Sequence, residues 1–455
     1  MALGFPNQSL MGSAEISVGR RPSAVETVFF NVMVSLTDRR SIFGRACLFF
    51  FIALCPIGDF MLQGTPLRSL GASISIFPLF GLVLKAGSEW LLSDRIRVGR
   101  SATIGFCYVL LTGIYGLLFF GLWSQGENLV WKSFTSLVSL LAVVFATQLD
   151  YGDRRAVRAG VYGALLLVVG GFVFGNSNPL EFPDLTENGV LHFSPLPDVR
   201  PRGLASEPSE FSITAVSVGL LSVYVTRSRT RKILLGFLTL GLLIASGSKG
   251  GILALFICVV VLCVLKWHSR WYQVAVWLLA VLPLGMILIW LLPTLFPEDA
   301  FALSGTVPTR FSMIICSLMT VEHNPFGVGL TGFLPAIARY LPGAMSALAS
   351  VFPFPLNFSE VTDYITSADM VSTKTFFFDQ LIRFGIPFAV VFFAFVGSLV
   401  KRLALLRQTI LLVAILAAAI AVTTYVPGTG NFAIPIVFGV ALTEVNGGPR
   451  PDRSE

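Results

Sequence analysis

The sequence predicts an all-α polytopic membrane protein with about 12 transmembrane helices and a large extracytoplasmic loop that carries short helices. Three observations predict this class. The 455 residues are 55% hydrophobic and only 13% charged, whereas soluble domains carry about 25% charged residues. Apolar runs of about 20 residues match the roughly 30 Å hydrocarbon core of a bilayer. These runs are continuous rather than alternating, which favours helices over a closed β-barrel.

The candidate spans follow one another along most of the chain. They lie at 43–62, 70–90, 102–123, 129–149, 157–175, 211–226, 233–247, 250–266, 273–295, 378–400, 408–424 and 431–444. We therefore expect an N-terminal tail (1–41), a single transmembrane domain (42–445) and a C-terminal tail (446–455). The N-terminal tail lacks the pattern of a cleaved signal peptide.

The positions of Lys and Arg predict the orientation, because these residues accumulate in cytoplasmic loops. Most of them lie in the tails and in alternate connections between spans. Examples are Arg154, Arg155, Arg158, Arg227, Arg229, Arg231 and Lys232. Both termini are therefore expected in the cytoplasm, with the long polar segments 176–210 and 296–377 on the opposite side. The same bias accounts for the net charge of +7, so no nucleic-acid partner is expected.

Eight basic residues lie on the disfavoured outer side, and five of them are candidates for one site. Two precede the sixth span, one occupies the hairpin after the seventh, one opens an amphipathic run, and one precedes the tenth span. These residues are Arg200 and Arg202, Lys249, Arg310, and Lys374. Cationic side chains at a membrane surface suit phosphate, which Arg can bind through two parallel hydrogen bonds. Alternatively, each of them contacts lipid headgroups or pairs with a carboxylate of the loops.

The outer segments also carry carboxylates, which commonly bind sugar hydroxyls. A carboxylate within hydrogen-bond reach of an attacking hydroxyl can act as its general base. Glu207, close to Arg202, is the first candidate for this role, and Asp369 is a candidate for substrate binding. The alternative role for Glu207 is to cap the helix that begins near Pro208.

No metal or nucleotide cofactor is expected. The three histidines, His192, His268 and His323, share no metal-ligand spacing, and the cysteines show none either. Residues 327–332 match Gly-x-Gly-x-x-Gly, but a nucleotide site requires a preceding strand and an acidic partner. We interpret this segment as a flexible turn. Charges near span ends, including Lys85 and Arg383, are expected to reach the headgroups by snorkelling.

Four segments resemble those of bacterial O-antigen and exopolysaccharide polymerases. They are Arg202-Gly-Leu-Ala-Ser-Glu-Pro-Ser-Glu-Phe211, the hairpin Ser246-Gly-Ser-Lys-Gly-Gly251, Arg310 with Asn324-Pro-Phe-Gly-Val-Gly329, and Lys374-Thr-Phe-Phe-Phe-Asp379 continuing to Pro387. Lys249 stands where Arg is usual in that hairpin. The resemblance extends from about residue 195 to 395, in the expected order. It identifies the chain as similar to the O-antigen ligase and polymerase superfamily.

The resemblance implies a metal-independent glycosyltransferase of the bacterial inner membrane, with its active site on the periplasmic face. It implies an undecaprenyl-diphosphate-linked oligosaccharide as substrate, and membrane lipids and a chain-length regulator as partners. Arg202, Glu207 and Arg310 would then be catalytic, and Arg200, Lys249, Asp369 and Lys374 would bind substrate. Ligases of this superfamily have a His near the span that follows the distal loop. Residues 372–376 contain none, which favours a polymerase over a ligase, with a flippase or other transporter as a second alternative.

Overall fold

The structure is a computed structural model, and it describes most of the chain between Ser41 and Gly447. The described residues are 41–58, 73–92, 100–121, 123–124, 127–177, 203–205, 208–248, 250–252, 254–258, 297–351, 356–366, 372–426 and 431–447. Within these ranges the chain is almost entirely helical. Its one pair of strands consists of β1 (Trp123–Ser124) and β2 (Glu127–Asn128), which pair antiparallel within the described residues.

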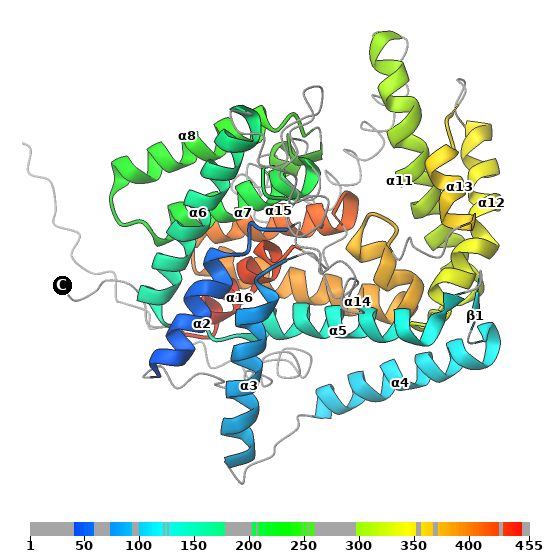
Figure 1. The fold of residues 1–455 in the computed structure, drawn as a ribbon, viewed down its shortest axis with the longest axis horizontal. Coiled ribbons are helices and arrows are strands. Elements are labelled where there is room, and N and C mark those ends of the chain that lie inside the picture. Colours follow the sequence, from blue (N-terminus) through cyan, green and yellow to red (C-terminus); the bar gives the residue numbers. More distant parts are fainter. Residues whose placement is uncertain are drawn as a thin grey trace, which may run out of the picture.

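The helices are shown in Figure 1. In chain order they are α2 (Ile42–Ala53), α3 (Ile76–Leu92), α4 (Arg100–Phe120), α5 (Leu129–Gln148), α6 (Arg154–Ser177), α7 (Pro208–Val225), α8 (Arg229–Ala245), α11 (Pro297–His323), α12 (Phe333–Val351), α13 (Ser359–Thr366), α14 (Phe376–Leu405), α15 (Thr409–Thr424) and α16 (Ala433–Val445). Polar residues in the connections cap the N-termini of several of these helices. Asn128 accepts a hydrogen bond from the Val130 amide (2.9 Å), and Asp153 accepts one from the Arg155 amide (3.1 Å). Such caps satisfy backbone donors that the first helical turn leaves without partners.

Each predicted span that the structure describes contains a helix, although some spans extend beyond it: residues 54–56 of the first form a turn, and Trp123 of the third lies in β1. Three helices are long and apolar enough to cross a membrane: Leu129–Gln148, Arg154–Val173 and Phe376–Leu405. Shorter apolar helices occupy other predicted spans, while 273–295 and much of 250–266 lie outside the described residues. The helical class and its membrane-compatible helices are therefore confirmed, and the number of 12 spans stays a prediction.

Large apolar side chains cover the outside of these helices. Leu118, Leu166, Phe237 and Val390 are all exposed. An apolar surface of this extent is typical of a molecule that contacts a membrane or another protein. The exposed residues come from α4, α6, α8 and α14, so this surface belongs to several of the predicted spans.

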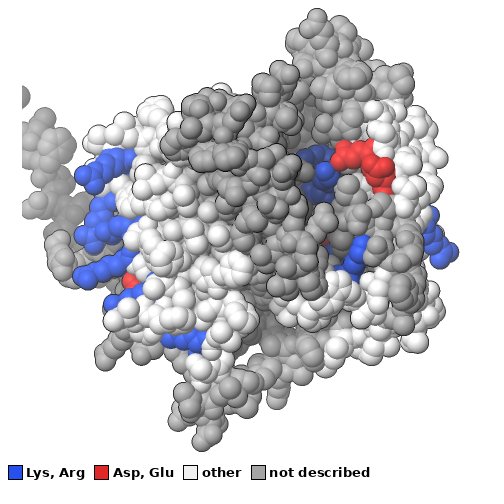
Figure 2. All heavy atoms as spheres, in the orientation of Figure 1, with Lys and Arg blue, Asp and Glu red and all other residues white. Residues whose placement is uncertain are grey.

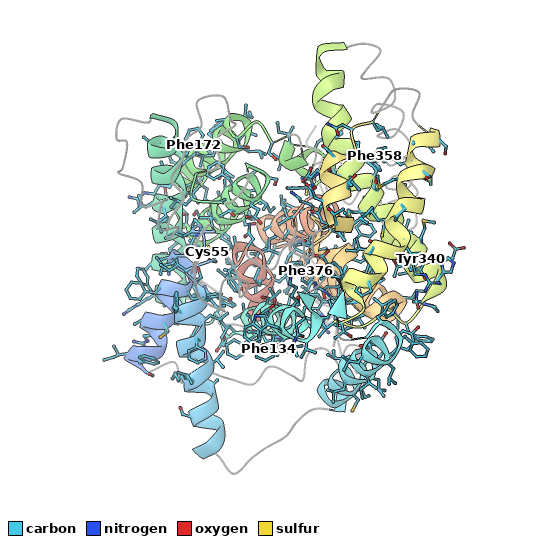
Figure 3. The ribbon with its side chains drawn as sticks, turned by 45° about the vertical axis from the view of Figure 1, so that its right-hand side comes forward. Cys55, Phe134, Phe172, Tyr340, Phe358 and Phe376 are labelled. Atoms are coloured by element: carbon cyan, nitrogen blue, oxygen red, sulfur yellow. The ribbon has the colours of Figure 1, made fainter. Side chains whose placement is uncertain are left out.

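The interior has two main parts. The larger core is built by α2, α6, α7, α14, α15 and α16, and it includes Cys55 and residues of α15 with no exposed surface. A smaller core holds α11, α12 and α13 together, and it includes Tyr364 and Ile382. In Figure 3, Phe358 and Tyr340 lie in this second block, whereas Phe376 lies near the centre of the molecule. The start of α14 joins the two parts, because Phe376 packs against the larger core and Ile382 is buried in the smaller one.

The distal polar segment is helical, as the sequence predicts. Two of its helices are longer than the short ones expected, because α11 has 27 residues and α12 has 19. The amphipathic run after Arg310 forms part of α11. Its most deeply buried face contains Met313, Cys316 and Thr320, while Leu318 is exposed.

Helix ends that the sequence assigns to the inner side of the membrane lie together. The Tyr151 amide donates to Thr443 Oγ1 (3.1 Å), which joins the start of α6 to the end of α16. Glu444 accepts hydrogen bonds from Tyr224 (2.9 Å) and Gln408 (3.2 Å). These contacts bring the end of α7 and the start of α15 to the same place. In Figure 2, basic side chains gather along the left-hand edge, where Figure 1 shows α6 and α8.

Helix ends assigned to the outer side gather in the same way. The Gly58 amide donates to Leu204 O (2.9 Å), which joins the end of α2 to the segment before α7. Asn431, before α16, donates to Thr214 Oγ1 in the second turn of α7 (2.9 Å). The Phe376 amide donates to Val426 O (2.8 Å) and joins the start of α14 to the end of α15. These contacts define two separate ends of one helical bundle, and which end faces the cytoplasm stays a prediction.

Residues 327–332 include a turn, as expected, but the chain from Asn324 to Gly329 is held by hydrogen bonds to other segments. It fits into a break in α14, where Gly385 has a φ of 64° and Pro387 lacks an amide donor. The Val328 amide donates to Ile382 O (3.0 Å), the Gly329 amide to Arg383 O (2.9 Å), and the Ile386 amide to Pro325 O (2.8 Å). These bonds replace those that the helix break removes.

Tyr108 of α4 completes this junction. Its hydroxyl lies 2.7 Å from Phe384 O and 2.8 Å from Phe326 O, so it can donate a hydrogen bond to either carbonyl. Gly327 and Gly329 have φ values of 82° and 73°, and a side chain at either would collide with a main-chain carbonyl. The glycine pattern is therefore explained by close packing of three chain segments and not by nucleotide binding.

We expect Gly329→Val to destabilise the protein strongly. The new Cβ would meet the Thr112 carbonyl at a positive φ, and such strain costs about 1–3 kcal/mol before any packing loss. The matched control is Gly397→Ala, since Gly397 of α14 has open space around it. In detergent, thermal unfolding should begin far earlier for Gly329→Val than for Gly397→Ala. Equal midpoints would contradict the proposed packing.

Candidate active site

The outer end of α15 is the meeting point of four segments singled out in the sequence. Its final residues and the two that follow are Thr424, Tyr425 and Val426. The Val426 carbonyl accepts the Phe376 amide bond, and the Thr424 carbonyl accepts a long hydrogen bond from Arg310 Nη1 (3.4 Å). The other two of the four segments, at the start of α7 and in the hairpin after α8, lie beside Tyr425.

The described residues of the hairpin, 246–248 and 250–251, lie against the same end. A Cβ on Gly250 would lie 3.0 Å from Cγ of Tyr425, so the absence of a side chain permits this approach. Ser248 accepts a hydrogen bond from Ser212 (3.0 Å), which lies in the second turn of α7. The hairpin and the start of α7 are thus fixed to one another beside the Tyr425 ring.

Arg310 and Lys374 come together around Glu360. Lys374 Nζ lies 2.9 Å from Glu360 Oε1, and Thr309 donates to Glu360 Oε2 (2.8 Å). Arg310 is the next residue after Thr309, and its positive charge acts on the Glu360 carboxylate. These two cations, 64 positions apart in the sequence, therefore lie around one carboxylate in the structure, and their role as substrate ligands stays a prediction.

The pKa of Glu360 lies below its ordinary value of 4.5. Burial by itself would raise it, but the hydrogen bonds from Lys374 and Thr309 and the charges of Lys374 and Arg310 outweigh this effect. Glu360 is therefore ionised at neutral pH. A carboxylate with a depressed pKa is a weak proton acceptor, so its position favours holding the cations over general-base catalysis.

Lys374 is held in an unusual backbone conformation. Its φ is 66°, a region that residues other than glycine seldom adopt. Asp379 supports this turn by accepting hydrogen bonds from the Thr373 amide (2.5 Å) and the Ser372 hydroxyl (2.8 Å). The strained turn directs Lys374 toward α13, where Glu360 lies.

Arg383 does not snorkel to a headgroup, so this prediction was wrong. Its side chain is 3% exposed. Its guanidinium lies over the Phe333 ring at 4.4 Å, within the range of a cation–π contact, and Asp379 is a nearby opposite charge. The helix break described above holds Arg383 inside the junction of α14 with α12.

Tyr425 is a site residue that the sequence analysis missed. Its side chain is 5% exposed, and its hydroxyl lies near Ser212 without completing a hydrogen bond in the described part of the chain. Burial raises the pKa of this hydroxyl, and the positive charge of Arg310 opposes that shift. In the sequence, the available signal for Tyr425 was its position directly after an apolar run, on the predicted outer side. The run itself gives no indication that the other segments converge there.

Several predicted site residues lie outside the described residues. They are Arg200, Arg202, Glu207, Lys249 and Asp369. The chain next to three of them is described. Gly203 lies directly after Arg202 and packs against Phe211, Pro208 begins α7 after Glu207, and Gly250 follows Lys249. Their assigned roles stay predictions.

The structure also describes His323 and other side chains of the types that bind metals. His323 Nδ1 lies 2.8 Å from Met319 O in its own helix. Among the residues that the structure describes, no group of three or more His, Cys, Asp or Glu side chains could hold a metal ion. The described part of the site consists of two cations, one carboxylate and hydroxyl groups.

The chain is similar to one curated relative, while no protein-family model matches it. This relative is the "Uncharacterized 49.5 kDa protein in cps region" of Klebsiella pneumoniae. The two are 26% identical over 358 residues, which cover 78% of this chain and 82% of the relative.

We expect Glu360→Gln to weaken the fold at neutral pH and to lose this effect in acid. A folded pKa below the unfolded one adds stability above pH 4.5, and this stability disappears as the pH falls through the folded value. The side chain is 45% exposed, so the gain is at most about 1 kcal/mol. The gap between the wild-type and Glu360→Gln unfolding midpoints, followed from pH 7 to pH 3.5, should close below pH 4.5.

The exposed Asp363 on the same helix provides the control for this measurement. At pH 7, Asp363→Asn should stay within about 0.5 kcal/mol of the wild type. If the difference in unfolding midpoint between the wild type and Glu360→Gln instead grows as the pH falls, the ion pair is not the source of the effect.

Proposed function

We propose that this protein is a polysaccharide polymerase of the bacterial inner membrane. It would transfer a growing glycan from undecaprenyl diphosphate to the non-reducing end of a lipid-linked repeat unit. The observation that carries this proposal is the convergence of the four family-like segments on the outer end of α15. The bundle of about 12 spans, with both termini in the cytoplasm, belongs to the same proposal.

The similarity to a protein of a cps region supports a role in capsular or related surface polysaccharide synthesis. At 26% identity, it supports the biosynthetic context more than the reaction. The reaction is argued from the site. Cationic groups next to hydroxyls on an outward-facing surface suit a sugar joined to a diphosphate.

In the proposed reaction, an acceptor hydroxyl oxygen bonds to the anomeric carbon while the bond from that carbon to the phosphate oxygen breaks. The bonding electrons leave with the diphosphate, and the hydroxyl proton passes to a base. Arg310 and Lys374 would stabilise the growing negative charge, a contribution of several kcal/mol. Arg202, Arg200 and Lys249 would assist from neighbouring segments. Direct displacement would invert the anomeric configuration.

Two roles are assigned to the carboxylates in this hypothesis. Glu360 would keep Arg310 and Lys374 positioned until the diphosphate arrives, because its depressed pKa makes it a weak base. Glu207 remains the candidate general base, and Asp369 a candidate for sugar binding. No step in this reaction requires a metal or a nucleotide, because the sugar–phosphate bond supplies the driving force.

Deletion of the gene separates the proposal from its alternatives. Without a polymerase, surface acceptors carry single repeat units. Without an O-antigen ligase they carry no glycan, and without a flippase the lipid-linked repeat units stay on the cytoplasmic side. A gel of the surface glycan from the deletion strain distinguishes the first two outcomes, and the sidedness of the lipid-linked units identifies the third.

We expect Arg310→Ala to lower polymer synthesis by at least about 100-fold, the typical loss when a group that stabilises transition-state charge is removed. Arg310→Lys should keep part of the activity, because it retains the charge but not the planar guanidinium. The assay is the ladder of chain lengths that purified protein makes from lipid-linked repeat units. Arg339→Ala is the matched control, since Arg339 is an exposed cation of α12 that lies over the Tyr340 ring. An undiminished ladder from Arg310→Ala would remove this residue from the mechanism.

A further inference from the structure

A second candidate site lies at the opposite end of the bundle from the outer end of α15. A cavity of about 220 Å³ opens between the start of α6, the connection from α7 to α8, and the end of α16. Its lining includes four basic residues and one acidic residue: Arg154, Arg158, Arg227, Lys232 and Glu444. This is the end where the sequence predicts the cytoplasmic loops.

The size of the cavity fits a small charged group. It far exceeds the roughly 10–15 Å³ that one water molecule requires. It is smaller than the roughly 300–1,000 Å³ of pockets that enclose whole drug-sized ligands. A phosphate-bearing headgroup lies between these limits.

The charge of the lining is not balanced from within. Glu444 accepts hydrogen bonds from Tyr224 and Gln408 and lies 3.9 Å from Arg154, so this carboxylate already has its partners. No ion pair compensates Arg158 or Lys232 among the residues that the structure describes. In addition, Arg158 Nε is buried without a hydrogen-bond partner in the described part of the chain. An unsatisfied buried guanidinium donor costs free energy, and an anion in the cavity would compensate the positive charge of this guanidinium.

The sidedness of basic residues explains why they lie at this end but not why they line one cavity.

A neighbouring feature indicates the kind of anion. A groove of about 650 Å³ between α2 and α6 shares Gly152 and Arg154 with the cavity. Ile42, Phe49 and Phe50 line this groove, and Ile42 and Phe50 are exposed. Arg45, Asp153 and Arg155 also line the groove, and Arg45 pairs with Asp153 (2.9 Å). A groove with apolar side chains that shares residues with a basic cavity matches the chemistry of a lipid tail and its headgroup.

We propose that this cavity binds the phosphate of an anionic membrane lipid, with an acyl chain lying along the groove between α2 and α6. Arg158 and Lys232 are the principal phosphate ligands, and Arg154 lies where the headgroup meets the groove. This site is separate from the candidate active site and does not depend on the proposed polymerase reaction.

Thermal unfolding of the purified protein in an uncharged detergent tests the proposal. Three additions are compared: phosphatidylglycerol, phosphatidylcholine and inorganic phosphate. Phosphatidylglycerol should raise the unfolding midpoint, whereas phosphatidylcholine should have little effect. In Arg158→Gln/Lys232→Gln, the apparent affinity for phosphatidylglycerol should fall at least about tenfold, because two charge-assisted contacts are lost.

The matched control is Arg229→Gln/Arg231→Gln, which removes two exposed charges of α8 that do not line the cavity. It should keep the wild-type response. Protection by inorganic phosphate as well, lost in the same variant, would support the phosphate site and identify a soluble phosphate compound as the occupant. An equal response of the two double variants would overturn the proposal. If the first variant does not fold, Arg158→Lys and Lys232→Gln are compared singly by the same measure.

Discussion

The carbonyls at the outer end of α15 impose the constraint on which the candidate site depends. The last carbonyls of a helix have no donors within that helix, and the carbonyl of Val426, two residues beyond α15, also needs a donor. Here donors come from distant parts of the chain. The Phe376 amide bonds Val426 O, and Arg310 reaches Thr424 O. Satisfying these groups brings α11 and the start of α14 to the same point, and the hairpin at Gly250 packs beside them.

A second constraint fixes the direction of the cations once the segments have met. The break in α14 at Gly385 is stabilised by Asn324–Gly329 and by Tyr108, so the first turns of α14 are attached to α4 and α11. Asp379 lies in these turns and holds the turn at Lys374. Because Lys374 then pairs with Glu360, the helix break at Gly385 helps to determine where the Lys374 ammonium group lies. Backbone geometry and site electrostatics are therefore linked through α14.

The sequence predicted the helices well because hydrophobic length and charge sidedness are local properties. It also predicted that Arg310 and Lys374 share one site, since both lie in segments assigned to the same side. It could not predict that Glu360 lies between them, because nothing in the sequence distinguishes this carboxylate from Asp363 three residues later. Arg383 was placed wrongly, because an arginine near the end of a span usually snorkels. Its burial depends on a cation–π contact with Phe333, a residue 50 positions away.

The most direct test of the account is a disulfide between positions 250 and 425 on the outer face of the membrane. Gly250→Cys and Tyr425→Cys would be combined in a chain whose six native cysteines are replaced. Their Cβ atoms lie close enough for a bond, since the Cβ of a residue at 250 would be 3.0 Å from Cγ of Tyr425. The account predicts that this disulfide forms spontaneously, and that a membrane-impermeant reductant cleaves it in spheroplasts. Two free thiols, or a bond cleaved only after permeabilisation, would contradict the convergence of the segments or its position outside the cytoplasm.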